Sequence, residues 1–328
     1  MLGPRGCLSI VRCPMRKPLL LILLAVLLVV VGPVLLQQAR TPAKRSLEGD
    51  SLDATRFREV TFTNQAQSIE LAGLMFLPRG SGPFPAAVVI HGSGTSKRDN
   101  RWYLSLTHYL QDHGIAVLLP DKRGSEQSDG DWRNASFEDL ATDSLAAVRF
   151  LDEQSGLPIS HIGLIGMSQG GWIAPLAAAQ SPRVAFVVSV VGSAVSTHRQ
   201  FLYEEQHNLR QLGMLPGISH LLAYPATSVN RHWVQRDFWS AVGDFDPLPY
   251  WSKLDVPSLA LYGDLDSNVP SARSAALLRA LDNPAIEARI YPGSGHALED
   301  PPGSGNRIFR RDALGDIRDF ILASDGRG

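Results

Sequence analysis

The pentapeptide Gly166-Met167-Ser168-Gln169-Gly170 places a serine between two glycines, directly after the mostly apolar run 161–165. This is the pattern of a nucleophile elbow, a sharp turn between a strand and a helix that exposes a serine hydroxyl. Glycines flank such a turn because a Cβ there would obstruct it. The small residues at 174–179 favour a helix packed closely beneath the turn. Ser168 is therefore predicted to be a catalytic nucleophile.

A serine nucleophile needs a base to accept its proton and an acid to orient that base. His296 follows the β-rich run 288–291 in a glycine-containing loop and lies downstream of the serine, so it is predicted to be the base. Asp264 and Asp266 follow the strand-like run 257–262. Loops at the carboxyl edge of parallel strands are where such groups meet, and both aspartates remain candidates for the acid.

The segment His91-Gly92-Ser93-Gly94 directly follows the apolar run 86–90. Ester and amide hydrolysis passes through an oxyanion, which backbone N–H groups stabilise, one after the nucleophile and one from an earlier loop. Glycines allow a loop to turn its amides toward such a site. The segment is therefore predicted to supply part of an oxyanion hole.

The remaining sequence alternates short β-rich runs with helical stretches. This alternation predicts a mainly parallel sheet with helices on both faces, led by an antiparallel pair. The expected strands are 57–64, 67–77, 86–90, 115–119, 162–165, 184–191, 257–262 and 288–291. The expected helices are 101–112, 136–153 with Ser136 as N-cap, and 307–323.

Residues 196–250 interrupt this rhythm with a predicted helix at 198–212 followed by irregular sequence. An insertion of this size between two strands predicts a cap over the site. Its aromatic residues would either line an apolar acyl pocket or pack the cap onto the core. Those residues are Tyr203, Trp233, Phe238, Trp239 and Phe245. The pair Glu204-Glu205 offers a site for the α-amino group of a peptide substrate.

Composition limits the class of protein. Of 328 residues, 44% are hydrophobic and 19% are charged, as in a folded globular protein. Seven of the 31 basic residues and none of the 32 acidic ones lie in residues 1–45, so the remaining chain is acidic. An acidic domain is a poor partner for nucleic acid, and no metalloprotease or nucleotide-binding motif is present. Both cysteines, Cys7 and Cys13, precede the apolar segment described next, so no disulfide is expected in the domain.

The segment 18–36 is 19 residues long, carries no charge and follows four basic residues. It predicts a single membrane span with a cytoplasmic N-terminus, and the alternative is a cleaved secretory signal. The predicted organisation is thus 1–37 as anchor or signal, 38–55 as linker and 56–328 as the hydrolase domain with its cap. The domain would lie outside the cytoplasm, in the periplasm of a bacterium, or be secreted if the signal is cleaved.

Taken together, these motifs resemble serine hydrolases of the α/β-hydrolase superfamily, in the branch of dienelactone-hydrolase-like and acyl-peptidase-like esterases. The matching segments span residues 57–325 and comprise 91–94 with Arg98-Asp99 downstream, 121–125, 166–171, 263–270 and 295–296. The resemblance implies Asp266 as the acid, the amides of Gln169 and Ser93 as the oxyanion donors, and neither a cofactor nor a metal. Met167 stands where such esterases often carry histidine. The segment 121–124 is expected to form a turn with local charge pairing.

The predicted function is hydrolysis of small carboxylic esters through an acyl-enzyme, with a Ser168–Asp266–His296 triad. The alternatives within the same fold are an aminopeptidase or amidase, and a thioesterase or lactonase. An alternative of another class is a catalytically silent, membrane-anchored binding protein. Labelling by a fluorophosphonate separates that class from the enzymes, since only an activated serine reacts.

Overall fold

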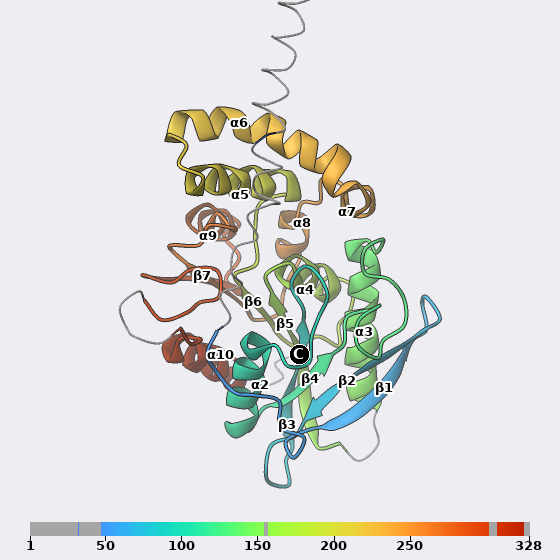
Figure 1. Ribbon diagram of the computed structural model, residues 1–328. Helices are drawn as coiled ribbons and strands as arrows, with labels where there is room; N and C mark the ends of the chain where they lie inside the picture. Colours follow the sequence, from blue (N-terminus) through green and yellow to red (C-terminus); the bar gives the residue numbers. More distant parts are fainter. Residues whose placement is uncertain (1–31, 33–46, 154–156, 302–306, 325–328) are drawn as a thin grey trace, which may run out of the picture.

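The computed structural model describes residues 32, 47–153, 157–301 and 307–324 (Figure 1). Within them, eight strands form one sheet in the order β1-β2-β4-β3-β5-β6-β7-β8. The strands are β1 (Arg58–Asn64), β2 (Ile69–Phe76), β3 (Phe84–Ile90), β4 (Ala116–Pro120), β5 (Ile159–Met167), β6 (Val187–Val190), β7 (Ser258–Gly263) and β8 (Ile286–Tyr291). This is the predicted set, with ends that differ by a few residues.

The sheet is mainly parallel, as the sequence predicts. β2 pairs antiparallel with both β1 and β4, while every pair from β4 through β3, β5, β6 and β7 to β8 is parallel. Six neighbouring strands therefore end at one edge of the sheet. Loops that follow these strands are brought together there although they are far apart in the sequence.

Helices cover both faces of the sheet. They are α2 (Arg101–Asp112), α3 (Phe137–Glu153), α4 (Gly170–Ala178), α5 (Thr197–Gln211), α6 (Pro216–Val229), α7 (Arg236–Val242), α8 (Leu248–Trp251), α9 (Ser271–Arg279) and α10 (Arg311–Ala323), with a π-helical turn η1 (Asn230–Val234). Buried side chains of α3, α4, α8 and α9 form the core on one face, and those of α2 and α10 form the core on the other.

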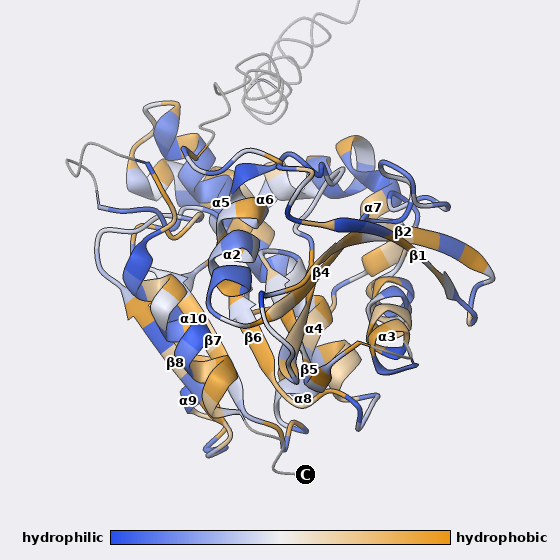
Figure 2. Ribbon diagram, turned by 90° about the horizontal axis from the view of Figure 1, so that it is seen from below, coloured by the Kyte–Doolittle hydropathy of each residue, from blue (hydrophilic) through white to orange (hydrophobic). Residues whose placement is uncertain are grey.

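The central strands are hydrophobic along their whole length. All residues of β6 and β7 are buried, which is expected where helices cover both faces of a parallel sheet. Figure 2 shows these hydrophobic strands at the centre, with hydrophilic residues on the surrounding helices. The sheet is thus a rigid support for the loops at its edge.

The insertion between β6 and β7 consists of helices. α5 begins and ends one residue before the predicted helix, but the expectation of irregular sequence after it was wrong, because α6, η1 and α7 follow. α6 begins with Pro216, whose missing N–H is harmless in the first turn of a helix. In Figure 1, α5 and α6 lie side by side above the sheet edge.

Ser136 caps α3 as predicted. Its Oγ accepts a hydrogen bond from Asp139 N–H (3.0 Å), and the Asp139 carboxylate accepts one from Ser136 N–H (2.9 Å). This reciprocal pair satisfies two backbone donors at the helix start. The closing helix, α10, begins at Arg311 rather than at the predicted residue 307.

The predicted membrane segment 18–36 lies outside the described residues, except for Gly32. Among the residues that are described, no helix is both long enough and apolar enough to cross a bilayer.

Candidate active site

Ser168 lies at the turn between β5 and α4. Its φ is +53°, a left-handed conformation that is uncommon for residues other than glycine. The turn is closely packed, since a Cβ on Gly166 would lie 2.1 Å from Gly170 O, and one on Gly170 would lie 2.2 Å from Ile90 O. The two glycines of the motif therefore allow the strand, turn and helix to pack against each other, as expected for a nucleophile elbow.

His296 follows β8 and lies against Ser168. Its Nε2 is 2.8 Å from Ser168 Oγ, and its Nδ1 is 2.8 Å from Asp266 Oδ2. A carboxylate can only accept, so Nδ1 carries the proton and Nε2 is free to accept a hydrogen bond from the serine hydroxyl. The structure thus brings Ser168, His296 and Asp266 into one hydrogen-bonded chain.

The Asp266 carboxylate is held firmly. Its side chain is fully buried, and its Oδ1 accepts hydrogen bonds from Asn268 N–H (2.8 Å) and Val269 N–H (2.9 Å). Burial lowers the pKa of His296, but the charge and hydrogen bond of Asp266, together with the charges of Glu204 and Glu299, outweigh this effect, and the pKa is raised overall. Asp266 thus strengthens His296 as a proton acceptor.

Asp264, the other candidate acid, has a different partner. Its Oδ1 accepts a hydrogen bond from Gly293 N–H at 2.7 Å and so joins the loop after β7 to the loop after β8. Within the described residues, the carboxylate that reaches His296 Nδ1 is that of Asp266.

The loop 91–94 lies beside the nucleophile. A Cβ on Gly92 would come within 3.2 Å of Ser168 Cβ, and Tyr103 Oη accepts the Gly92 N–H at 2.9 Å. The N–H groups of Ser93 and Gln169 donate no hydrogen bond to another described residue. Both predicted oxyanion donors are therefore available to a ligand in the part of the chain that the structure describes.

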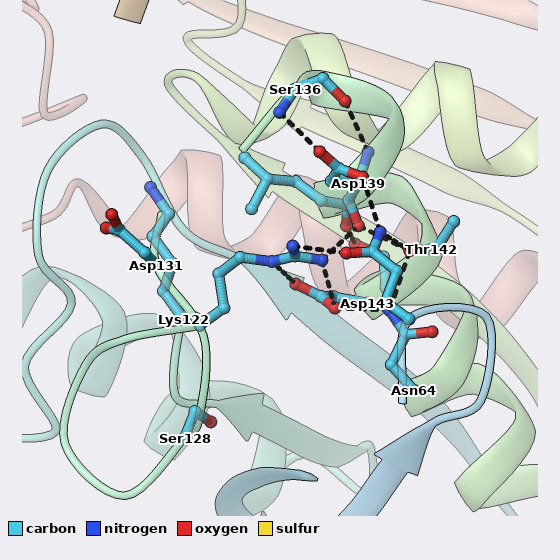
Figure 3. Close-up of polar contacts among 12 residues, drawn as sticks. Asn64, Lys122, Ser128, Asp131, Ser136, Asp139, Thr142 and Asp143 are labelled. Atoms are coloured by element: carbon cyan, nitrogen blue, oxygen red, sulfur yellow. Dashed lines mark hydrogen bonds and ion pairs between the residues drawn. The ribbon is translucent and has the colours of Figure 1, made fainter. Parts of the chain in front are cut away.

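The turn 121–124 after β4 does more than the sequence predicted. The prediction that its charges pair within the turn was wrong, because Asp121 binds Arg98, and Arg123 binds Asp143 on α3. Between them, Lys122 is buried and reaches the carbonyls of the loop 91–94. Figure 3 shows Lys122 on this turn beside the polar network of Asn64, Asp139, Thr142 and Asp143.

The helix α5 touches the acid loop. Tyr203 Oη donates a hydrogen bond to the backbone carbonyl of Asp266 at 2.8 Å. Next to it, Glu204 is partly buried and lies near His296; its burial raises its pKa to about 7. The first residues of the cap therefore form part of the surroundings of Ser168 and His296.

Most cap aromatics pack rather than line a pocket. Phe238 and Phe245 pack against the core around Phe137, and Trp239 is buried against Phe201. Trp233 is 82% exposed on η1. Phe238, Phe245 and Trp239 therefore pack the cap, and the side chain of Trp233 lies in solvent.

No group of three or more His, Cys, Asp or Glu side chains within residues 32, 47–153, 157–301 and 307–324 is arranged to hold a metal ion.

A model of the prolyl oligopeptidase family matches residues 101–323, which include Ser168, Asp266 and His296. The chain belongs to this family. It is 24% identical over 274 residues to the esterase EstD of Thermotoga maritima, covering 79% of the chain and 64% of that protein. It is 26% identical over 261 residues to the human acylamino-acid-releasing enzyme, covering 72% of the chain and 33% of that enzyme. The chain thus spans less than two thirds of these relatives.

Solved structures agree on the fold. An esterase of Pyrococcus furiosus superposes with a TM-score of 0.61 at 16% identity, covering 86% of this chain and 97% of that one. The α/β hydrolase GrgF of a Penicillium species gives 0.60 at 22% identity, covering 82% and 99%. The fold is therefore that of an α/β hydrolase, as the resemblance of the motifs implied.

Proposed function

We propose that this chain is a serine hydrolase that cleaves small carboxylic esters through an acyl-enzyme. The single observation that carries the proposal is the 2.8 Å contact between Ser168 Oγ and His296 Nε2, with Asp266 bound to the other imidazole nitrogen. Family membership and the esterase among the relatives support the same conclusion.

In the first half of the reaction, Ser168 Oγ attacks the ester carbonyl carbon and its proton passes to His296 Nε2. The N–H groups of Gln169 and Ser93 stabilise the oxyanion that forms. His296 then donates the proton to the leaving alcohol as the carbon–oxygen bond breaks, which leaves the acyl group on Ser168. In the second half, His296 takes a proton from water as the water oxygen attacks the acyl carbon. The bond from that carbon to Ser168 Oγ then breaks, His296 returns the proton to Oγ, and the acid is released.

The test is hydrolysis of p-nitrophenyl acetate and butyrate by the wild-type chain and by Ser168→Ala. We expect the variant to fold normally and to lose activity by several orders of magnitude. Labelling of the wild type by a fluorophosphonate, absent in the variant, separates an enzyme from a silent binding protein. Ester hydrolysis that survives Ser168→Ala would contradict the assignment.

The second candidate function is removal of an amino-terminal residue from a peptide. The observation that favours it is Glu204, a partly buried carboxyl group near His296, with its Oε1 3.5 Å from Asn268 Nδ2. A carboxylate at this place would pair with the ammonium group of a substrate. A dipeptidyl aminopeptidase of Pseudoxanthomonas mexicana is also among the relatives, at 23% identity.

Aminoacyl p-nitroanilides test this candidate beside the esters. An aminopeptidase would cleave the anilides, and Glu204→Gln would raise KM for the anilides far more than it changes KM for the esters. An enzyme that cleaves only the esters would exclude it.

A further inference from the structure

Lys122 is a buried ammonium group whose side-chain hydrogen bonds all lead to the predicted oxyanion hole, while its Nζ also lies 5.5 Å from the centroid of the Trp132 ring. Its Nζ is 2.6 Å from Gly92 O, 3.2 Å from Gly94 O and 3.1 Å from Gln169 Oε1. An ammonium group has three N–H donors, and here it meets three acceptors. Burial of a cation without a counter-ion costs free energy, so packing alone does not explain why a lysine lies here.

The contact with Gly92 fixes the direction of an amide. The carbonyl of Gly92 and the N–H of Ser93 are the two ends of one planar, trans peptide group, so they point in opposite directions. Binding the oxygen end to Lys122 therefore orients the Ser93 N–H away from the lysine. A cation on the oxygen also polarises the amide and strengthens its N–H as a donor.

The contact with Gln169 joins the second donor to the same cation. The Gln169 backbone N–H directly follows the nucleophile, and its side-chain oxygen binds Lys122. The loop after β3 and the elbow after β5 are thus connected through a single ammonium group. Lys122 is itself fixed by the neighbouring ion pairs of Asp121 with Arg98 and of Arg123 with Asp143.

We infer that Lys122 is a positioning residue of the oxyanion hole, which holds the amides of Ser93 and Gln169 in register and strengthens the Ser93 donor. The inference rests on the proposed function and extends it to a residue outside the triad. Lys122 acts through the two backbone segments, and its direct contacts are with the chain itself.

The protonation state of Lys122 gives the inference a measurable signature. Burial lowers the pKa of Lys122 to about 7, and a neutral amine has one donor fewer than the three acceptors need. Among the surrounding groups, burial and Lys122 lower the pKa of His91 to about 4, so this imidazole is neutral at pH 7. Asp121 is paired with Arg98, and Asp131 lies 3.7 Å from Arg133 on an exposed loop. An alkaline decline in kcat/KM is therefore expected from Lys122.

The experiment compares Lys122→Met and Lys122→Arg with the wild type in hydrolysis of p-nitrophenyl butyrate across pH. We expect Lys122→Met to lower kcat by about 10–10²-fold with KM within about threefold, because a misplaced oxyanion donor affects the transition state and not substrate binding. The alkaline decline should disappear in this variant. Lys122→Arg keeps a permanent charge, so it should retain more activity than Lys122→Met and also lose the decline.

Two further measurements exclude a merely structural role. The affinity for a trifluoromethyl ketone, which forms an oxyanion adduct with serine, should weaken by the same factor as kcat/KM. Lys253→Met, which removes an exposed lysine just after α8, is the matched control and should behave as wild type. If Lys122→Met does not fold, Gln169→Leu tests the same link, with a smaller fall in kcat and unchanged KM.

The outcomes separate the inference from the proposed function. The inference alone is overturned if Ser168→Ala abolishes hydrolysis while Lys122→Met, or Gln169→Leu in its place, equals the wild type in kcat, pH profile and ketone affinity. A wild-type chain that neither hydrolyses the ester nor reacts with a fluorophosphonate overturns both.

Discussion

Asp264 and Asp266 are two positions apart in the sequence but have different partners in the structure. Asp266 binds His296 Nδ1, while Asp264 binds the backbone of Gly293. We therefore expect Asp266→Asn to lower kcat by about 10³–10⁴-fold, as for loss of the acid that sets the tautomer of the base. Asp264→Asn is the matched control and should cost less than tenfold. Steady-state kinetics on p-nitrophenyl butyrate measures both, and a larger loss for Asp264→Asn would reverse the roles.

The raised pKa of His296 determines the acid side of the pH profile. His296 must be neutral to accept the serine proton. The effect of burial on its pKa is outweighed by Asp266 and the other nearby carboxylates, so this pKa lies above the ordinary value of 6.5. Activity should therefore be lost as pH falls through this raised value, with the midpoint of kcat/KM above pH 6.5.

Glu299 provides a test of the electrostatic cause of the raised pKa of His296. Its charge contributes to the raised pKa of His296. Glu299→Gln should therefore move the acid midpoint to lower pH, whereas Glu287→Gln, an exposed substitution on β8, should leave it in place. A midpoint that moves upward in Glu299→Gln would contradict this electrostatic account.

At the scale of elements, α5 holds the acid loop through Tyr203, whose hydroxyl donates to Asp266 O. Tyr203→Phe removes this hydrogen bond, and we expect a loss of about 1 kcal/mol in unfolding free energy and a severalfold fall in kcat as the loop loosens. Tyr224→Phe on the exposed side of α6 is the control and should change neither. Urea unfolding and ester kinetics measure the two effects, and a Tyr203→Phe enzyme with wild-type kcat would show that α5 does not position the acid.

The sequence predicted the elements whose signals are local. The runs of Val and Ile marked the buried strands, and Ser136 with Asp139 marked the start of α3. The helices after residue 212 were missed because α6 contains Pro225 and has apolar residues exposed at Ile218 and Leu221, so its pattern does not separate a buried from an exposed face.

The candidate site was only partly predictable for a related reason. Ser168, His296 and the aspartates follow strands directly, so their meeting at one sheet edge follows from topology. The role of Lys122 depends on contacts with residues that are between 28 and 47 positions away in the sequence. These contacts join the turn after β4 to the loops after β3 and β5. Three charged residues after a strand, here 121–123, predict a turn. Nothing in the sequence distinguishes the lysine, whose buried side chain reaches the loops after β3 and β5, from its two neighbours.

At the scale of the whole molecule, charge divides the chain in two. The acidic body carries the hydrolase fold, while residues 1–45 hold seven basic residues and no acidic one. We propose that segment 18–36 anchors this body to a membrane, with the four preceding cations on the cytoplasmic side. Arg40, Lys44 and Arg45 follow the segment, but a translocated domain tolerates nearby charge, and four cations precede the span against three after it.

The location can be measured on the full chain. Fractionation should find the full-length protein in the membrane, and alkaline carbonate should not release it, because an uncharged segment of 19 residues is long enough to span the hydrocarbon core. In a bacterium with two membranes, added protease should remove the hydrolase domain from spheroplasts but not from intact cells. Placing one arginine at Leu27 should weaken retention, since a charge at the centre of a span is costly. A soluble product that begins near residue 40 would instead show that the segment is a cleaved signal, with the same site then acting in solution outside the cytoplasm.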